Sequence, residues 1–297
     1  MSLAGGISYV SPMRVMITGA AGMLGRDVAE AARRAGHDVS ALGREDLDVT
    51  DAAGVLVLTA RERPDVVVNC AALTDVDGAE AAEEAATRVN GSGAGHVAAA
   101  AAAAGAFVVH VSTDYVFDGA GRRPYREDDA TGPRTAYGRS KLAGELAVAG
   151  AAPGGYAIAR TSWLFGPHGG NFVDTMRRLG AERDSVTVVD DQVGCPTYTG
   201  HLAAALVELA ETRPAGVLHV AGSGSCTWFD LARATFARTG IDCEVVPGKT
   251  ADLARPAPRP AFSVLGISRP ETPLLPPWEQ GLEAHLSAQA AINGGTR

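Results

Sequence analysis

The amino-acid sequence predicts an α/β protein in which helices cover both faces of a doubly wound parallel sheet. Three observations predict this fold. An apolar run at 15–17 leads into a glycine-rich turn and then into an alanine-rich, amphipathic segment at about 23–35. Two further runs, at 65–70 and 107–112, are rich in valine, which is typical of parallel strands buried on both faces. Helical segments alternate with these strands through the first half of the chain.

Composition and charge narrow the class of protein. The 297 residues are 46% hydrophobic and 20% charged, which is ordinary for a globular protein with a sizeable core. The net charge of −8 and the lack of a basic run argue against a nucleic-acid partner. No apolar stretch has membrane-spanning length, and the start of the chain lacks the regions of a signal peptide. We therefore expect no membrane partner, and we expect residues 1–12 to form a disordered extension.

The cysteines indicate a reducing compartment and no metal site. All four lie far apart and lack metal-ligand spacing, namely Cys70, Cys195, Cys226 and Cys243. Reduced thiols in a cytoplasmic protein are the simplest interpretation. Two acidic residues on the predicted last helix, Glu279 and Glu283, are ordinary solvent-facing residues. We therefore predict no metal cluster and a cytoplasmic location.

The glycine-rich turn predicts a dinucleotide site. Gly19, Gly22 and Gly25 follow a predicted strand and open a predicted helix, as in a Rossmann-type fold. The first glycine permits the turn, the second lets the backbone approach a phosphate, and the third lets the helix pack on the strand. Free N–H groups and the positive end of the helix favour a diphosphate there. A glycine-rich turn without a ligand is the alternative.

The end of the second strand bears on the choice of cofactor. This strand is predicted at 37–42, and an acidic residue at its end would bind the ribose 2′-hydroxyl of NAD. The chain has Arg44 here instead, and a guanidinium matches the 2′-phosphate of NADP. A solvated arginine is an equal alternative, and Glu45 and Asp46 follow at once. NADPH is therefore the preferred cofactor, and NADH stays open.

The next segments continue the alternation of strands and helices. Residues 48–49 are predicted to end a short strand, and Thr50 or Asp51 to cap a helix that runs to about Glu62. The strand at 65–70 ends in small residues, which let the backbone lie against a cofactor. Residues 79–104 form an alanine-dense helical stretch, which we expect to be divided into two pieces by Gly91, Gly93 and Gly95.

Candidate catalytic residues follow the strand at 107–112. Thr113 lies directly after it, at the edge where doubly wound sheets bind ligands. If a helix begins near Thr135, Tyr137 and Lys141 fall one turn apart on the same face. A lysine ammonium beside a phenol would lower the tyrosine pKa toward the range useful for proton transfer, and the Thr113 hydroxyl would share the hydrogen bond to a carbonyl. A surface helix pair is the alternative.

The second half of the chain supplies a smaller, interleaved lobe. We predict a dinucleotide-binding domain at 13–167 with a returning segment at about 216–224, and a substrate-binding lobe at 168–215 and 225–297. Arg259 lies in a proline-rich loop, and a solvated arginine is favoured over a contact with a substrate phosphate. The elements predicted in this half are strands at 156–160 (the sixth in chain order), 186–190 and 216–221, and helices at 171–179, 199–211, 227–238 and 276–291.

Several motifs together resemble the extended short-chain dehydrogenase/reductases. They are TGAAGMLG at 18–25, NCAA at 69–72, STDYVFDG at 112–119 and YGRSK at 137–141. Within that superfamily the chain is similar to the dTDP-4-dehydrorhamnose reductases. The narrower resemblance depends on LDVTD at 47–51, AALTDVDGAE at 71–80, RTSWLFG at 160–166, GNFVDTM at 170–176 and DDQVGCPTYT at 190–199.

The resemblance implies a role for each matching residue. Tyr137 would be the proton donor to the C4 oxygen of a dTDP-sugar, Lys141 would bind the nicotinamide ribose, and Thr113 would hold the C4 oxygen. The implied cofactor contacts are Gly22, Met23 and Leu24 on the diphosphate, Asp48 and Val49 on the adenine, and Ala71 and Ala72 on the inner ribose. The implied substrate contacts are Asp114, Tyr115 and Trp163 near the sugar and Asn171 in the segment against the nucleotide.

The resemblance also leaves alternatives open. The chain would be a reductase of dTDP-4-dehydro-β-L-rhamnose, a reductase or epimerase of another nucleotide-activated 4-keto sugar, or a non-catalytic relative such as a methionine adenosyltransferase regulatory subunit. Retention of the Thr, Tyr and Lys together favours an enzyme. Trp163 would be either a platform for the sugar or an aromatic plug between domains. A homodimer and a Mg²⁺ requirement stay open, because the family includes metal-bridged dimers.

Overall fold

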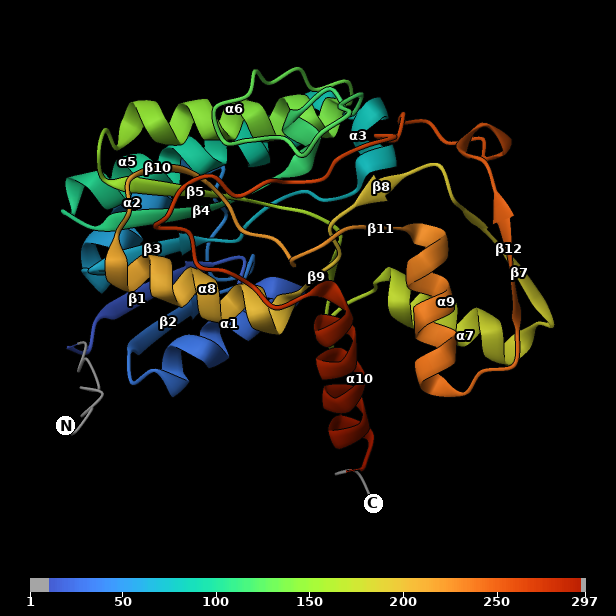
Figure 1. Ribbon diagram of the computed structural model, residues 1–297. Coiled ribbons are helices and arrows are strands. Elements are labelled where there is room, and N and C mark those ends of the chain that lie inside the picture. Colours follow the sequence, from blue (N-terminus) through green and yellow to red (C-terminus); the bar gives the residue numbers. More distant parts are fainter. Residues whose placement is uncertain (1–10, 295–297) are drawn as a thin grey trace, which may run out of the picture.

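Six parallel strands form the central sheet of the computed structural model, which describes residues 11–294 (Figure 1). Their spatial order is β10-β5-β4-β3-β1-β2. The chain passes from β1 to β2 on one side and to β3 on the other, so a topological switch point lies beside β1. This arrangement confirms the predicted doubly wound sheet. The strands are β1 (Arg14–Thr18), β2 (Asp38–Leu42), β3 (Val66–Asn69), β4 (Phe107–Thr113), β5 (Tyr156–Thr161) and β10 (Gly216–His219).

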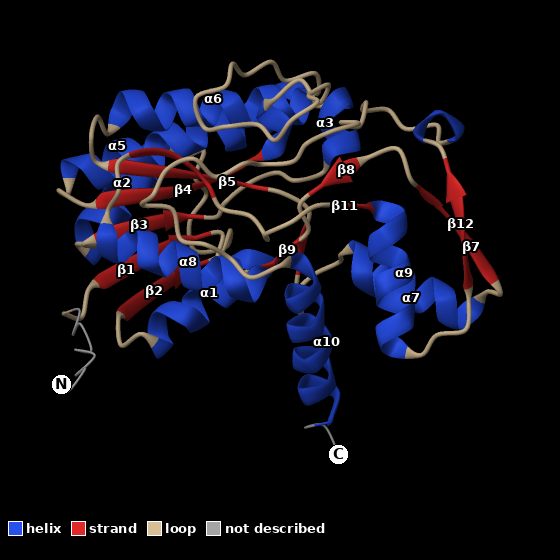
Figure 2. Ribbon diagram, in the orientation of Figure 1, coloured by secondary structure: helices blue, strands red, loops and turns tan. Residues whose placement is uncertain are grey.

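Two helical layers cover the sheet because alternate strand residues point to opposite faces (Figure 2). Ile17 packs on one face with two helices, and its neighbour Met16 packs on the other face with three. Valine is the commonest buried strand residue on both faces, as expected for strands that are covered on both sides. The first layer is α1 (Met23–Arg34) and α8 (Thr199–Thr212), and the second is α2 (Ala52–Glu62), α5 (Ala94–Ala103) and α6 (Ala136–Ala151).

A smaller lobe lies at one end of the sheet (Figure 1). Its core joins Met176 and Phe236 to the strand valines of a two-stranded parallel sheet. The C-terminal helix packs beside it through Leu282. The elements of this region are α7 (Phe172–Glu182), β7 (Ser185–Val189), α9 (Trp228–Thr239), β12 (Glu244–Gly248) and α10 (Trp278–Gly294), with the short strands β6 (Leu164–Phe165), β8 (Val193–Gly194), β9 (Thr197–Tyr198) and β11 (Cys226–Thr227).

Local capping sets where several helices begin. Asp51 accepts hydrogen bonds from two backbone N–H groups of α2, which selects it over Thr50. Thr135 caps α6 in the same way, which confirms the predicted start of this helix. Thr227 caps α9 and forms a capping box with Asp230. These ends were predictable because each depends on side chains within a few residues.

Two expectations about the first half are wrong. Residues 48–49 form a turn and no strand, so the strand at Tyr156 is the fifth of the sheet. The alanine-dense stretch breaks at Ala82, between α3 (Val76–Ala81) and α4 (Glu83–Thr87), and a π-helical segment (Arg88–Gly93) runs on into α5. Its glycines do not break the helix. Two of them, Gly91 and Gly95, instead give room to α6, because a Cβ at these positions would lie 3.3 Å and 3.1 Å from alanine Cβ atoms of that helix.

The division into domains stays a prediction, although two observations bear on it. β10 pairs with β5, so residues 216–219 do return to the main sheet. α8, which falls in the range predicted for the lobe, packs with α1 against that sheet. Of the predicted disordered extension, residues 1–10 lie outside the described residues. Within residues 11–294, no helix combines the length and apolar character needed to cross a membrane.

Candidate active site

A cavity of about 1370 Å³ lies between the carboxyl ends of the sheet strands and the lobe. The structure brings nearly all the predicted site residues to its walls. Asn171 is the exception, since it does not line this cavity. The predicted residues that do line it are Gly19, Gly22, Met23, Leu24, Gly25, Arg44, Asp48, Val49, Ala71, Ala72, Thr113, Asp114, Tyr115, Tyr137, Lys141 and Trp163.

The turn between β1 and α1 fits a diphosphate. Gly19 has φ +68°, and a Cβ there would lie 2.6 Å from the Ala71 backbone nitrogen. A Cβ on Gly25 would lie 2.3 Å from the Gly19 carbonyl oxygen, so this position also excludes a side chain. No side chain caps the N-terminus of α1, and its first turn holds no acidic residue. Its N–H groups are therefore available to an anion in the cavity.

The far end of the cavity carries an arginine where an acid would select NAD. Arg44 lines the cavity after β2, whereas Glu45 and Asp46 do not. The Asp46 carboxylate instead accepts a hydrogen bond from the Gly43 N–H at 2.8 Å. Asp48 accepts hydrogen bonds from the Thr50 N–H and hydroxyl, which hold its pKa below the ordinary value. This end of the cavity therefore suits the 2′-phosphate of NADP.

A buried asparagine that sequence reasoning missed holds the strand-end loop. The Asn90 side chain accepts a hydrogen bond from the Leu73 N–H at 2.8 Å and donates to the Leu73 carbonyl at 3.0 Å and the Ser140 hydroxyl at 2.9 Å. It therefore fixes the loop after Ala71 and Ala72 to α6, beside the cavity. An amide inside an alanine-rich helix was the available signal, because a buried polar group needs partners.

Three predicted catalytic side chains meet at the carboxyl end of β4. The Thr113 hydroxyl hydrogen-bonds the Tyr137 side chain, and the Tyr137 ring meets the Tyr115 ring edge-on at 5.6 Å. Lys141 follows one helical turn after Tyr137, and its ammonium donates a hydrogen bond to the Val111 carbonyl at 2.7 Å. Tyr137 and Lys141 are both buried.

Burial is the main cause of the pKa shifts of Tyr137 and Lys141. It raises the pKa of Tyr137 to about 12, partly opposed by the hydrogen bond with Thr113. It also lowers the pKa of Lys141 to about 8, partly opposed by Glu145. The prediction that Lys141 lowers the tyrosine pKa is wrong, because the ammonium is directed at the Val111 carbonyl and desolvation of the phenol dominates. Tyr137 therefore carries its proton at neutral pH, as an acid catalyst must.

Asp114 offers an acceptor next to these groups. Burial raises its pKa to about 6, although its hydrogen bonds with Ser263 and Thr113 oppose the shift. Its Oδ2 is buried and has no hydrogen-bond partner among the described residues. A buried acceptor on the cavity wall is suited to a ligand hydroxyl.

Aromatic residues close the lobe side of the cavity. Trp163 has φ +48° and stacks on Trp228 with ring centroids 3.6 Å apart and planes at 4°. The Trp228 indole N–H donates to the Gln192 side chain at 3.1 Å. Trp163 thus joins sheet and lobe and also lines the cavity, so the two predicted roles are compatible. Trp228 and Gln192 were missed because no local pattern links them to Trp163.

Two arginines converge on one carboxylate at the cavity wall. Asp77 Oδ2 lies 2.7 Å from an Arg259 nitrogen and 3.7 Å from an Arg255 nitrogen. The hydrogen bond from Arg259 holds the pKa of Asp77 below its ordinary value. The Arg259 side chain is only 12% exposed, so the expectation of a solvated arginine is wrong. One carboxylate and two guanidinium groups leave a net positive charge facing the cavity.

Asn171 serves the local structure of α7. Its side chain accepts a hydrogen bond from the Asp174 N–H and so caps this helix. Its amide nitrogen donates to the Gly166 and Gly169 carbonyls at 3.0 Å and 3.1 Å. Since both ends of the amide are engaged, a role in substrate binding stays a prediction.

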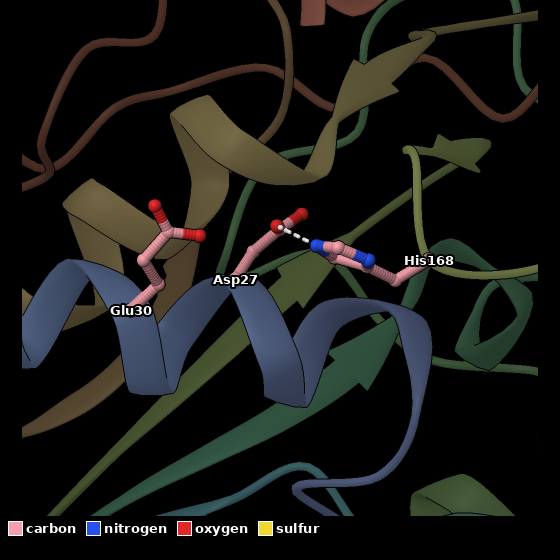
Figure 3. A group of neighbouring side chains, drawn as sticks. All are labelled: Asp27, Glu30 and His168. Carbon is pink, nitrogen blue, oxygen red and sulfur yellow. Dashed lines mark ion pairs between the residues drawn. The ribbon is translucent and has the colours of Figure 1, made fainter. Parts of the chain in front are cut away.

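A cluster of three potential metal ligands, none of which lines the cavity, is shown in Figure 3. Asp27 and Glu30 project from α1 toward His168 on the loop after β6, with ligand atoms within 4.8 Å of one another. The His168 imidazole lies 3.4 Å from Asp27 Oδ1. Sequence spacing predicted no such cluster, because His168 is far from the other two in the chain. Glu283 of the last helix, which was predicted to face solvent, is exposed and pairs with Arg238 at 3.2 Å.

Comparison with known proteins gives a consistent result. A family model described as RmlD substrate binding domain matches residues 13–290. The chain is 51% identical to a dTDP-4-dehydrorhamnose reductase of Streptomyces griseus, over 86% of each chain. It is 47% identical to a dTDP-4-keto-6-deoxy-D-glucose reductase of Streptomyces niveus, over 85% of this chain and 88% of that one. A crystal structure of a dTDP-4-dehydrorhamnose reductase from Bacillus anthracis in complex with NADP superposes with a TM-score of 0.90 at 38% identity, covering 93% of this chain and 99% of that one.

Proposed function

This chain belongs to the RmlD substrate binding domain family, and we propose that it reduces the C4 keto group of dTDP-4-dehydro-β-L-rhamnose to give dTDP-β-L-rhamnose, with NADPH as the reductant. One observation carries the proposal. Thr113, Tyr137 and Lys141 line the same cavity as the glycine turn, so an acid catalyst and a dinucleotide site open onto one space. The identity of the sugar is inferred from the names of similar reductases.

The side chains of the cavity account for the proton transfer. The glycine turn, Arg44 and Lys141 would hold NADPH, which would supply the hydride. The Thr113 hydroxyl and the Tyr137 phenol bind the C4 oxygen, and Tyr137 gives this oxygen its proton as negative charge develops there. An alkoxide is a stronger base than a phenolate, so the transfer is favourable even from a phenol whose pKa is about 12. The Lys141 ammonium, which donates a hydrogen bond to the Val111 carbonyl, would contact the ribose of the nicotinamide.

The paired arginines would hold the diphosphate of the sugar nucleotide. Arg259→Met is expected to raise the KM for the dTDP-sugar by about tenfold or more, because a charge-assisted hydrogen bond is lost. The change in kcat is expected to be smaller. Arg178→Met, which removes an exposed arginine of α7, is the control and should leave both constants unchanged. An equal KM in the Arg259 variant and the wild type would contradict this assignment.

Arg44 is expected to set the preference for NADPH. Arg44→Ala should raise the KM for NADPH by about tenfold, because the guanidinium partner of the 2′-phosphate is lost. The KM for NADH should change little, since NADH lacks that phosphate. Arg61→Ala, at an exposed arginine of α2, serves as the control in steady-state assays with both cofactors. A similar loss with both cofactors would show that Arg44 acts in some other way.

A coupled assay tests the function itself. The dTDP-4-keto sugar is generated by upstream enzymes, and NADPH oxidation is followed at varying protein concentration. A second reaction with dTDP-4-keto-6-deoxy-D-glucose tests another sugar, because a relative named for it is 47% identical. We expect faster oxidation with the rhamnose precursor. An epimerase would convert its substrate without net NADPH consumption, and a regulatory subunit would be inactive with both sugars.

Location and assembly are extensions of the same proposal. All four cysteines are free thiols, which supports a cytoplasmic location. A homodimer and the lack of a nucleic-acid partner stay predictions. Sedimentation of the purified protein at several concentrations would test the first.

A further inference from the structure

Glu145 is a third buried residue on the face of α6 that carries Tyr137 and Lys141. Tyr137, Lys141 and Glu145 follow one another at four-residue spacing, so they lie on one face of the helix. All three are buried, and Glu145 is only 4% exposed. A carboxylate is rarely this buried unless it is paired. The proposed reaction explains the first two residues and leaves Glu145 without a role.

The Glu145 carboxylate joins α6 to two strands. Its Oε1 accepts hydrogen bonds from the Ser112 hydroxyl of β4 at 2.6 Å and from the Arg160 Nε of β5 at 2.9 Å. Its Oε2 accepts a second bond from Arg160 at 2.7 Å, which completes a bidentate pair. Ser112 lies between Val111, whose carbonyl binds Lys141, and Thr113, whose hydroxyl binds Tyr137. The network therefore sits directly behind the catalytic contacts.

Glu145 is also the anion that acts on Lys141. Three titratable groups interact with this lysine from the elements around it: Cys70 after β3, His110 on β4, and Glu145 on α6 itself. Burial raises the pKa of the Cys70 thiol to about 12 and lowers the pKa of His110 well below its ordinary value, so both are neutral near pH 7. The third group, Glu145, forms an ion pair at 2.7 Å. Arg160 on β5 is the cation that balances it.

We propose that Glu145 is a positioning residue for the reductase: it ties α6 to β4 and β5 behind the catalytic contacts, and its carboxylate, one helical turn from Lys141, is the counter-charge of that buried ammonium. The inference builds on the proposed function, because that reaction needs the ammonium. Arg160 neutralises the buried Glu145 carboxylate through the bidentate pair, and it thereby limits the effect of this carboxylate on Lys141. The pair thus sets the pH above which Lys141 loses its charge.

The chain offers a direct measurement of this effect. It contains two lysines, Lys141 and Lys249, so ¹³Cε-labelled lysine gives two resolvable signals. The exposed Lys249 provides an internal reference. Glu145→Gln keeps the shape and removes the charge, and it is expected to move the Lys141 titration down by about one pH unit. Arg160→Met leaves the carboxylate unbalanced, and it is expected to move the titration up.

The opposite shifts of the Lys141 titration in the two variants distinguish this role from a purely structural one. Either single variant decides the test if the other does not fold. Glu83→Gln breaks the exposed pair that ties α6 to α4 through Arg139, and it should leave the Lys141 titration unchanged. An unmoved titration, or shifts of the same sign in both variants, would overturn the proposal. Because the NMR titration needs no substrate, it separates this result from a failure of the reductase assay.

Kinetics supply the second readout. In the pH profile of kcat/KM for NADPH oxidation, the fall at alkaline pH should move down in Glu145→Gln together with the Lys141 titration. Below that pH the variant should lose little kcat. Glu145→Ala also removes the acceptor for Ser112, so a loss of kcat at every pH is expected. If Glu145→Ala kept the wild-type kcat below that pH, the positioning role would be refuted.

Discussion

Replacing Tyr137 with phenylalanine is expected to reduce turnover by about 10²–10⁴-fold while NADPH still binds. The ring stays in place because its burial and its edge-on contact with Tyr115 do not need the hydroxyl. What is lost is the proton for the C4 oxygen and one hydrogen bond to it. Steady-state NADPH oxidation measures the first effect, and a fluorescence titration with NADPH measures cofactor binding.

A matched variant shows whether the loss belongs to this hydroxyl. Tyr156→Phe removes a phenol at the opposite end of β5, away from the cavity walls, and should leave turnover unchanged. Near wild-type turnover in Tyr137→Phe would remove this residue from the role of acid. Loss of NADPH affinity in parallel with turnover would mean that the variant has disturbed the fold of the site.

The second large effect is expected at the glycine turn. Gly19→Ala places a Cβ 2.6 Å from the Ala71 nitrogen, a contact that the backbone must move to relieve. We expect NADPH affinity to fall by at least about tenfold, because the turn and the loop at Ala71 both line the cofactor end of the cavity. The left-handed backbone at this position adds about 1–2 kcal/mol of lost stability.

Gly36 separates the steric effect from the backbone effect. It has φ +86°, and a Cβ there would meet nothing within 4 Å. Gly36→Ala should therefore lose stability through its backbone conformation and keep its NADPH affinity. Thermal denaturation and NADPH titration of both variants test this contrast. Equal NADPH affinities in the two variants would contradict the close approach inferred for Gly19.

Much of the fold could be predicted because its signals are local. Valine runs marked the buried strands, and Asp51, Thr135 and Thr227 marked helix starts through side chains a few residues away. The errors arose where the cause is distant in the chain. Gly95 indicates a helix break by itself, but its neighbour is Ala147 of α6, and the glycine serves close helix packing.

The site residues that could be predicted also have local signals, and those that were missed depend on distant parts of the chain. Thr113, Tyr137 and Lys141 were found because their motifs lie at strand ends that meet at one edge of the sheet. Trp228 and Asn90 were missed, since their partners are set by tertiary packing. The pKa of Tyr137 was predicted in the wrong direction for a related reason. Sequence shows that a lysine is nearby, but it does not show that burial outweighs the charge.

The most direct test of the proposed reaction is where the hydride goes. The protein is incubated with the dTDP-4-keto sugar and NADPH that carries deuterium at the transferred position of the nicotinamide, and the product is examined by NMR. We predict one deuterium at C4 of dTDP-β-L-rhamnose for each NADPH consumed. Deuterium at another carbon, or product formed without NADPH consumption, would contradict a C4 keto reductase.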